Sequence, residues 1–304
     1  MNRTKSNSSE KIAHQIVYRT IAAAKDKRYA LSNVRLNNKN HLYPAIAKSF
    51  SNYPQLKEVF AVSEFPSFDK IRKIPRIVLA NCTLEDELIW LASVLSTYTD
   101  KLDLFVKIKN EYNENVYTKN LESALKNLEE IENQFGYSLW LVRSKIYCIN
   151  FLYGIEKQEE YVENLIENGC YQNEFELHFI LNYSDLIKDN NEYDEYKESI
   201  FEIYRNLNID LDNIVHQVYR LAPDEIISSE NYAKILHQEE NRTIIDRYET
   251  YLYCLYCCVS KGIIDVSFIK RLKKIFKIEG EKILNNCYYF SEDVVDLKKY
   301  EFLS

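Results

Sequence analysis

Apolar residues recur every three or four positions through most of the chain, a pattern typical of helices that lie on a core. The pattern is clearest between residues 121 and 169. One apolar face there consists of Leu121, Ala124, Leu125, Leu128, Ile131 and Phe135. Gly136 and Gly154 then divide the stretch into three predicted helices with very short turns, which favours antiparallel neighbours.

The same reasoning predicts helices along the whole chain. We expect a first helix from about residue 9 to 24, with Ser9 as its N-cap, followed by short helices at 56–62 and 68–71. A further helix through Leu95 should be capped by Thr83, because Asp86 three residues later gives the spacing of a capping box. Further helices are predicted at 102–112, 118–135, 139–153, 156–168, 173–187, 192–206, 211–221, 229–239, 243–260, 265–277 and 279–289. The predicted fold class is all-α, an array of antiparallel helix pairs preceded by a basic, proline-containing N-terminal segment.

Spacings of 37 and then 35 residues separate Ala124, Tyr161 and Tyr196, which lie on every second predicted helix. Together with Leu128 and Trp140, with turns at Gly154 and Asn190-Asn191, the region of about residues 100–206 resembles a degenerate tetratricopeptide repeat. The resemblance implies a solenoid of helix pairs and a protein-binding role. Gly136 stands where the family usually ends its helix with proline.

Glycine and proline are scarce, with 5 of each in 304 residues, which suits helices better than sheets. Four of the five prolines lie between residues 44 and 75, so only short helices are expected there. We therefore divide the chain into a disordered tail (1–8), a basic and less regular helical region (9–82) and an acidic helical array (83–304).

Charge is distributed unevenly, since residues 1–76 carry fifteen Lys and Arg against five Asp and Glu, while the remaining 228 residues carry a net charge of −17. Such asymmetry indicates a polyanion-binding or partner-binding segment, or a basic segment that docks on its own acidic array. A second cationic face is predicted on the helix from residue 265. The candidate anion or partner contacts are Lys25, Lys27, Arg28, Arg35, Lys70, Arg72, Lys73, Arg76, Lys270, Arg271, Lys273 and Lys274.

The cysteines are odd in number, seven in all, and lie mostly within apolar patterns, which favours free thiols in a reducing compartment. Cys254, Cys257 and Cys258 share one helix side, but zinc usually takes four ligands, so we interpret them as buried core residues. No apolar run reaches the roughly 18 residues of a membrane span. We expect a soluble cytoplasmic protein.

Motifs that carry chemistry are absent or weak. No two glycines lie within six residues, which excludes phosphate-binding and dinucleotide loops, and the five histidines show no metal-binding spacing. Only His41, in the basic region, is a weak functional candidate. The string from Val294 to Lys298 resembles half of a metal-dependent nuclease site but lacks its second acid, and the pairs Glu159-Glu160 and Glu239-Glu240 are interpreted as solvated. We expect no catalytic residue, cofactor or metal.

Three hypotheses of function follow. The first is a non-enzymatic helical scaffold that binds a protein partner, for example as an accessory subunit of a bacterial antiphage defence system. The second is a nucleic-acid-binding protein that uses the basic N-terminal segment. The third is an enzyme whose site is assembled from distant residues.

Overall fold

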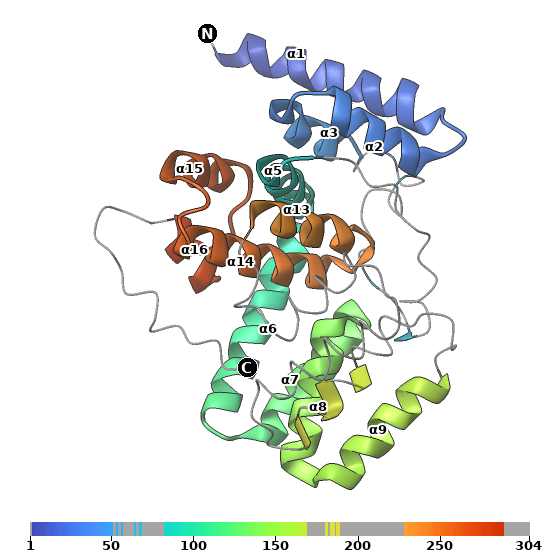
Figure 1. Cartoon of the computed structure of the whole chain (residues 1–304), viewed down its shortest axis with the longest axis vertical. Coiled ribbons are helices and arrows are strands. Elements are labelled where there is room, and N and C mark those ends of the chain that lie inside the picture. The colour runs from blue at the N-terminus through green and yellow to red at the C-terminus, as the bar shows by residue number, and fades with distance from the viewer. Residues whose placement is uncertain are drawn as a thin grey trace.

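The structure is a computed structural model, and it describes residues 2–50, 82–168 and 228–288. It also describes residues 53, 56, 64, 67, 68, 180, 181, 183–185, 187 and 188. Three groups of helices follow one another along the chain (Figure 1). No β-strand occurs in the described ranges. The all-α fold predicted from the sequence is confirmed.

The N-terminal group contains α1 (Asn2–Gln15), the π-helix η1 (Ile16–Ala22), α2 (Lys27–Asn37), the short 3-10 helix η2 (Asn40–Leu42) and α3 (Tyr43–Phe50). The central group contains α5 (Leu84–Leu95), η5 (Ser96–Tyr98), α6 (Thr99–Tyr117), α7 (Leu121–Phe135), α8 (Leu139–Tyr153) and α9 (Ile155–Asn168). The C-terminal group contains α13 (Ser229–Gln238), η7 (Glu239–Asn241), α14 (Ile244–Ser260), α15 (Val266–Ile275) and α16 (Lys282–Tyr288).

Most predicted helices are present within a few residues of their predicted bounds. The helix predicted at 139–153 coincides with α8, and Thr83 caps α5 by accepting a hydrogen bond from the Asp86 backbone N–H at 3.2 Å. Two predictions near the N-terminus are wrong. Because α1 begins at Asn2, residues 2–8 are helical rather than a disordered tail, and Ser9 is not the N-cap.

Pro44 is the only one of the four prolines of the basic region that the described residues include, and it lies in a short helix, as the sequence predicts. Pro44 is the second residue of α3, where its missing N–H breaks no helical hydrogen bond, so an eight-residue helix forms there. The predicted helices at 56–62, 68–71, 192–206 and 211–221 lie wholly or mostly outside the described residues, and only part of the one at 173–187 is described.

Helices α6 to α9 form an up-and-down array in which each packs on the next. The turns after α7 and α8 are made by Gly136 and Gly154, whose φ angles of 69° and 85° fall in the left-handed region that glycine adopts without strain. Because consecutive helices run antiparallel, the α6–α7 and α8–α9 turns lie toward one end of the array (Figure 1). The predicted antiparallel helix pairs are confirmed.

Helix α5 is the centre of the main core. It packs against α3, α13, α14 and α15, and its Trp90 is almost fully buried. One continuous apolar cluster extends from Ala13 to Cys287, so the basic N-terminal helices and the C-terminal helices share a core across the compositional boundary at residue 82. A smaller cluster connects α8 and α9 with Phe68, Ile180 and Tyr183.

Helix α14 is buried along most of its length. Its Cys254, Cys257 and Cys258 are free thiols within the core, as the sequence predicts, and Cys287 from α16 belongs to the same cluster. Burial raises the pKa of the Cys258 thiol to about 12. None of the described helices is both long and apolar enough to cross a membrane.

Candidate functional site

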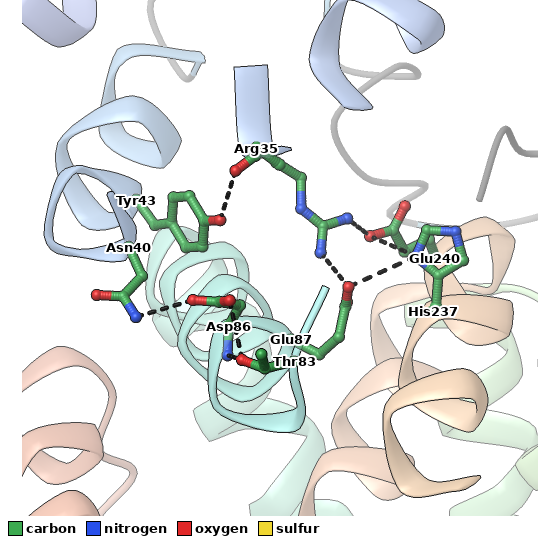
Figure 2. Close-up of polar contacts among 8 residues, drawn as sticks. All are labelled: Arg35, Asn40, Tyr43, Thr83, Asp86, Glu87, His237 and Glu240. Atoms are coloured by element: carbon green, nitrogen blue, oxygen red, sulfur yellow. Dashed lines mark hydrogen bonds and ion pairs between the residues drawn. The ribbon is translucent and has the colours of Figure 1, made fainter. Parts of the chain in front are cut away.

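Arg35 is the sequence-predicted contact residue whose place differs most from expectation. Its side chain on α2 is buried, with the residue 3% exposed, rather than presented to a partner. Its Nη2 lies 2.6 Å from Glu87 Oε1 on α5, and its Nη1 donates to Glu240 Oε1 in η7 (Figure 2). The prediction that Arg35 contacts an anion or a partner is therefore wrong, because two carboxylates of its own chain already hold it.

His237 on α13 completes a cluster of four ionisable side chains. Its Nδ1 lies 3.6 Å from Glu87 Oε1 and 3.8 Å from Glu240 Oε1 (Figure 2). We call Arg35, Glu87, His237 and Glu240 the buried ion cluster. With His237 protonated, two positive and two negative charges balance, which is how charges are tolerated away from water.

Aromatic residues position the guanidinium of Arg35. The Arg35 Cζ lies 5.0 Å from the centre of the Trp90 ring, in the arrangement of a cation–π contact. The Tyr43 hydroxyl donates to the Arg35 backbone carbonyl at 2.9 Å, and the Tyr43 and Trp90 rings meet edge to face. Arg35 therefore joins α2 to α5 by its side chain and to α3 by its backbone.

The pKa values in the cluster follow from these neighbours. Burial would raise the pKa of Glu87, but Arg35 and His237 outweigh it and lower this pKa to about 2. Burial would lower the pKa of His237, yet the adjacent Glu87 and Glu240 carboxylates raise it above 6.5 overall. The cluster therefore favours the ionised form of both side chains.

The same residues have the chemistry of a metal site. Glu87, His237 and Glu240 offer ligand atoms within 4.8 Å of one another, the only such group among the described residues. A divalent cation on those atoms would lie close to the Arg35 guanidinium, which already bonds to both carboxylates. We conclude that an arginine supplies the cation in this cluster and that the cluster is structural.

The stability of the protein should therefore depend on pH through His237. Because its folded pKa is raised, the stabilisation is complete below about pH 6.5 and is lost as the pH rises through the folded value. We expect the free energy of unfolding from urea titrations to fall above pH 6.5, by at most about 1.4 kcal/mol per pH unit. His237→Gln should flatten this dependence on pH, whereas His41→Gln, at an exposed residue, should not change it. An unchanged slope in His237→Gln would contradict the assignment.

Glu87 should make the stability of the protein depend on pH at the acidic end of the range. A carboxyl with a lowered folded pKa stabilises the protein above its unfolded value and loses that contribution as the pH falls toward 2. Between these limits Glu87 and His237 are both charged.

The other predicted contact residues occupy separate places. Lys25 is exposed between η1 and α2, whereas Lys27 and Arg28 are half-buried in the first turn of α2. On α15, Lys270 and Lys274 are exposed, while Arg271 and Lys273 are half-buried. Positions outside the described residues include Lys70, Arg72, Lys73, Arg76 and the nuclease-like string at 294–298.

Sequence reasoning missed most of the buried ion cluster. It treated Glu239-Glu240 as solvated, but Glu239 is fully buried and Glu240 is paired with Arg35, so that prediction is wrong. The available signal was the position of His237 directly after the apolar Ile235-Leu236, which places a polar ring near a core face. Glu159 and Glu160, by contrast, are exposed as predicted.

A different kind of candidate site lies at the end of the α6–α9 array. Large apolar side chains are exposed there, namely Tyr117 (77%), Phe151 (58%), Tyr153 (58%) and Ile155 (47%). Tyr147 packs on Phe151 with ring centres 4.7 Å apart. All four exposed residues belong to the ends of α6 and α8 or the start of α9, which the antiparallel packing brings to one end (Figure 1).

Acidic residues border these side chains. Helix α9 exposes five glutamates and one lysine; the glutamates are Glu156, Glu159, Glu160, Glu163 and Glu167. Lys157 pairs with Glu160, and Lys188 pairs with Glu159. The other three glutamates have no ion-pair partner among the residues that the structure describes. We call Tyr117, Phe151, Tyr153, Ile155 and the α9 glutamates the acidic aromatic end.

Comparison of the chain with protein-family models, curated proteins and solved structures gives no match. Fold and surface chemistry therefore define the class: an all-α array of antiparallel helix pairs with a structural ion cluster and an exposed, acidic, aromatic-rich end.

Proposed function

We propose that this protein is a non-enzymatic helical scaffold that binds a basic protein partner through its acidic aromatic end. The observation that supports this proposal most directly is the grouping of Tyr117, Phe151, Tyr153 and Ile155, each at least 47% exposed, on one end of a rigid helix array. Aromatic residues are enriched at the centres of protein interfaces, where they contribute most of the binding energy.

The negative charge of the α9 glutamates indicates that the partner is basic. The glutamates of α9 begin at Glu156, next to Ile155, and continue along the helix away from the aromatic group. A basic partner would be attracted to them over the Debye length of about 8 Å at physiological salt. The same charges repel nucleic acid. A basic amphipathic helix or basic loop with an apolar anchor fits both features.

The resemblance to tetratricopeptide repeats is compatible with this proposal. Stacked helix pairs present extended surfaces to other proteins, and α6 to α9 contact each other in sequence order. A role as a cytoplasmic accessory subunit of a bacterial multi-protein defence system is part of the same proposal.

The test compares proteins captured by the wild-type chain and by the triple variant Tyr117→Ser, Phe151→Ser, Tyr153→Ser. We expect one basic protein to be captured stoichiometrically after nuclease treatment and to bind the triple variant on the order of 100-fold more weakly, since interface aromatics are typical hot spots. Quantitative mass spectrometry of the captured proteins measures the stoichiometry of capture, and calorimetry with the purified partner measures the change in affinity. Retention of that protein by the triple variant would contradict the proposed site.

A matched control variant removes two exposed aromatic residues elsewhere, Tyr18→Ser and Tyr29→Ser in the N-terminal helices. It should bind the partner as the wild type does. Replacing Glu156, Glu163 and Glu167 by glutamine should weaken association mainly at low salt, because distant charges act chiefly on the association rate.

A further inference from the structure

Two cationic segments that are far apart in the sequence meet beside the start of α5. Arg271 Nη2 on α15 donates to Asn40 Oδ1 in η2 at 2.6 Å, across 231 residues of sequence. Asn40 Nδ2 in turn donates to Asp86 Oδ1 at 2.8 Å (Figure 2). This hydrogen-bond chain fixes η2 against α15, so Lys39 and His41, both exposed, lie next to the cationic face of α15.

The cationic face itself is fixed by the amphipathicity of α15. Phe268, Ile269 and Leu272 are buried against the core. Lys270 and Lys274, one helical turn apart on the opposite side, are exposed. We call Lys39, Lys270, Arg271 and Lys274 the cationic surface. It lies at the opposite end of α5 from the α6–α9 array (Figure 1).

The acidic residues near the cationic surface reduce its charge but leave it positive. Asp86 is engaged by Asn40 and by the Thr83 hydroxyl, which donates to it at 2.9 Å. Asp265 accepts from the Phe268 backbone N–H as the N-cap of α15, and Glu279 pairs with Lys277. Glu85 is exposed in the first turn of α5. Glu85, Asp86 and Asp265 therefore place three negative charges beside the four cations, and the net charge is positive.

We propose that the cationic surface binds the phosphodiester backbone of nucleic acid. Sequence-independent contacts to nucleic acid are made by Lys and Arg on phosphate oxygens, and lysines spaced along a fixed helix suit a chain of phosphates. An acidic protein is the less suitable ligand, because no Trp, Tyr or Phe of η2 or α15 is exposed to anchor a protein interface. This function is separate from partner binding at the acidic aromatic end.

The sequence hypothesis placed nucleic-acid binding in the basic N-terminal segment, whereas this proposal places it on α15, whose Lys270, Arg271 and Lys274 were already candidate anion contacts, together with Lys39. Lys25 lies before the first residue of α2 and Lys39 lies just beyond its last, so about 16 Å of helix separates them. The tertiary structure therefore joins Lys39 to α15 in the cationic surface, and the other basic residues of the N-terminal segment are not part of it.

The experiment measures fluorescence anisotropy of a labelled 25-base-pair DNA duplex and of the corresponding single strand with the full chain, from 50 to 300 mM salt. The test variant is Lys39→Gln, Lys270→Gln, Lys274→Gln. The control variant makes the same change in charge on the α6–α9 array, Lys107→Gln, Lys126→Gln, Lys157→Gln. Circular dichroism establishes that both variants fold.

We expect micromolar binding by the wild type at 50 mM salt and a loss on the order of tenfold or more in the test variant. The slope of log K against log salt for the duplex should become shallower by about 3, since each phosphate contact contributes about 0.9. Replacing the same three lysines by arginine should restore binding. The control variant should bind about as tightly as the wild type, because its three lysines lie away from the cationic surface.

Three outcomes would overturn the proposal. These are the absence of DNA binding at 50 mM salt, an equal loss in the test and control variants, and tighter binding of poly-glutamate than of either DNA with the same dependence on the three lysines. The last would identify an acidic protein as the ligand of this surface.

Discussion

Replacing Arg35 by methionine is expected to lower the free energy of unfolding by about 4 kcal/mol, because a buried ion cluster then loses its permanent cation. The side chain would keep much of its apolar contact with Trp90, but Glu87 and Glu240 would lose the guanidinium that both of them face. Two buried carboxylates would then share His237 alone. Urea unfolding at pH 7, followed by circular dichroism, measures the loss.

The control for this prediction is Lys25→Met, which removes an exposed cation from the same region and should change stability by less than about 0.5 kcal/mol. Arg35→Lys should fall between the two, because an ammonium keeps the charge but not the fork that reaches two carboxylates. The triple variant Arg35→Met, Glu87→Gln, Glu240→Gln should recover part of the loss, as apolar and neutral replacements of buried ion pairs often do. A loss in Arg35→Met no larger than in Lys25→Met would show that the cluster does not stabilise the fold.

Replacing Asp246 by alanine is expected to cost about 3 kcal/mol. Asp246 lies in the first turn of α14, but its carboxylate accepts hydrogen bonds from the backbone N–H groups of Leu139 at 3.0 Å and Trp140 at 2.9 Å, in the first turn of α8. It also accepts from the Thr243 hydroxyl at 3.2 Å. One buried side chain thus caps a helix that begins 107 residues earlier and joins the α6–α9 array to α14.

Asp265→Ala is the matched comparison for Asp246→Ala. Asp265 is also an aspartate that accepts from a backbone N–H at a helix start, but it is exposed and caps only its own helix, so its loss should cost about 1 kcal/mol. Asp246→Asn should be intermediate because it keeps one acceptor oxygen. Thermal unfolding of the three variants ranks their losses of stability. Equal losses in Asp246→Ala and Asp265→Ala would contradict the conclusion that Asp246 also caps α8.

The two proposed surfaces carry opposite charges and lie on different parts of the molecule. The acidic aromatic end lies on the α6–α9 array, and the cationic surface lies where η2 meets α15 (Figure 1). If both proposals hold, the protein brings a basic protein and a nucleic acid together on two separate surfaces of one molecule. Each surface has its own set of variants, so either proposal can fail without the other.

Local sequence predicted the helical elements well because their signals are local. The alternation of apolar and polar residues gives α8 its bounds, Thr83 and Ser138 cap the helices that follow them, and Gly136 and Gly154 end helices with backbone angles that favour glycine. The burial of Cys254 and Cys258 followed from the same periodicity. Where local signals were weaker, in residues 1–50, the prediction missed the start of α1 and did not include α2 or α3.

The chemistry of individual polar residues could not be predicted in this way. Arg35 and Lys25 belong to the same basic segment, and no local pattern says that one pairs with Glu240, 205 residues away, while the other is exposed. Asn40 likewise has no feature that points to Arg271. Burial and pairing depend on which faces of distant helices meet, which is a property of the packed molecule.

By itself, therefore, the sequence determined that this protein is all-α, where most of its helices lie, and that basic residues concentrate near its N-terminus and on α15. Only the tertiary structure decided which charges are internal and which are presented to solvent. The physical reason is that a helix requires only interactions within a few residues, whereas a buried charge requires an opposite charge brought to it by the fold.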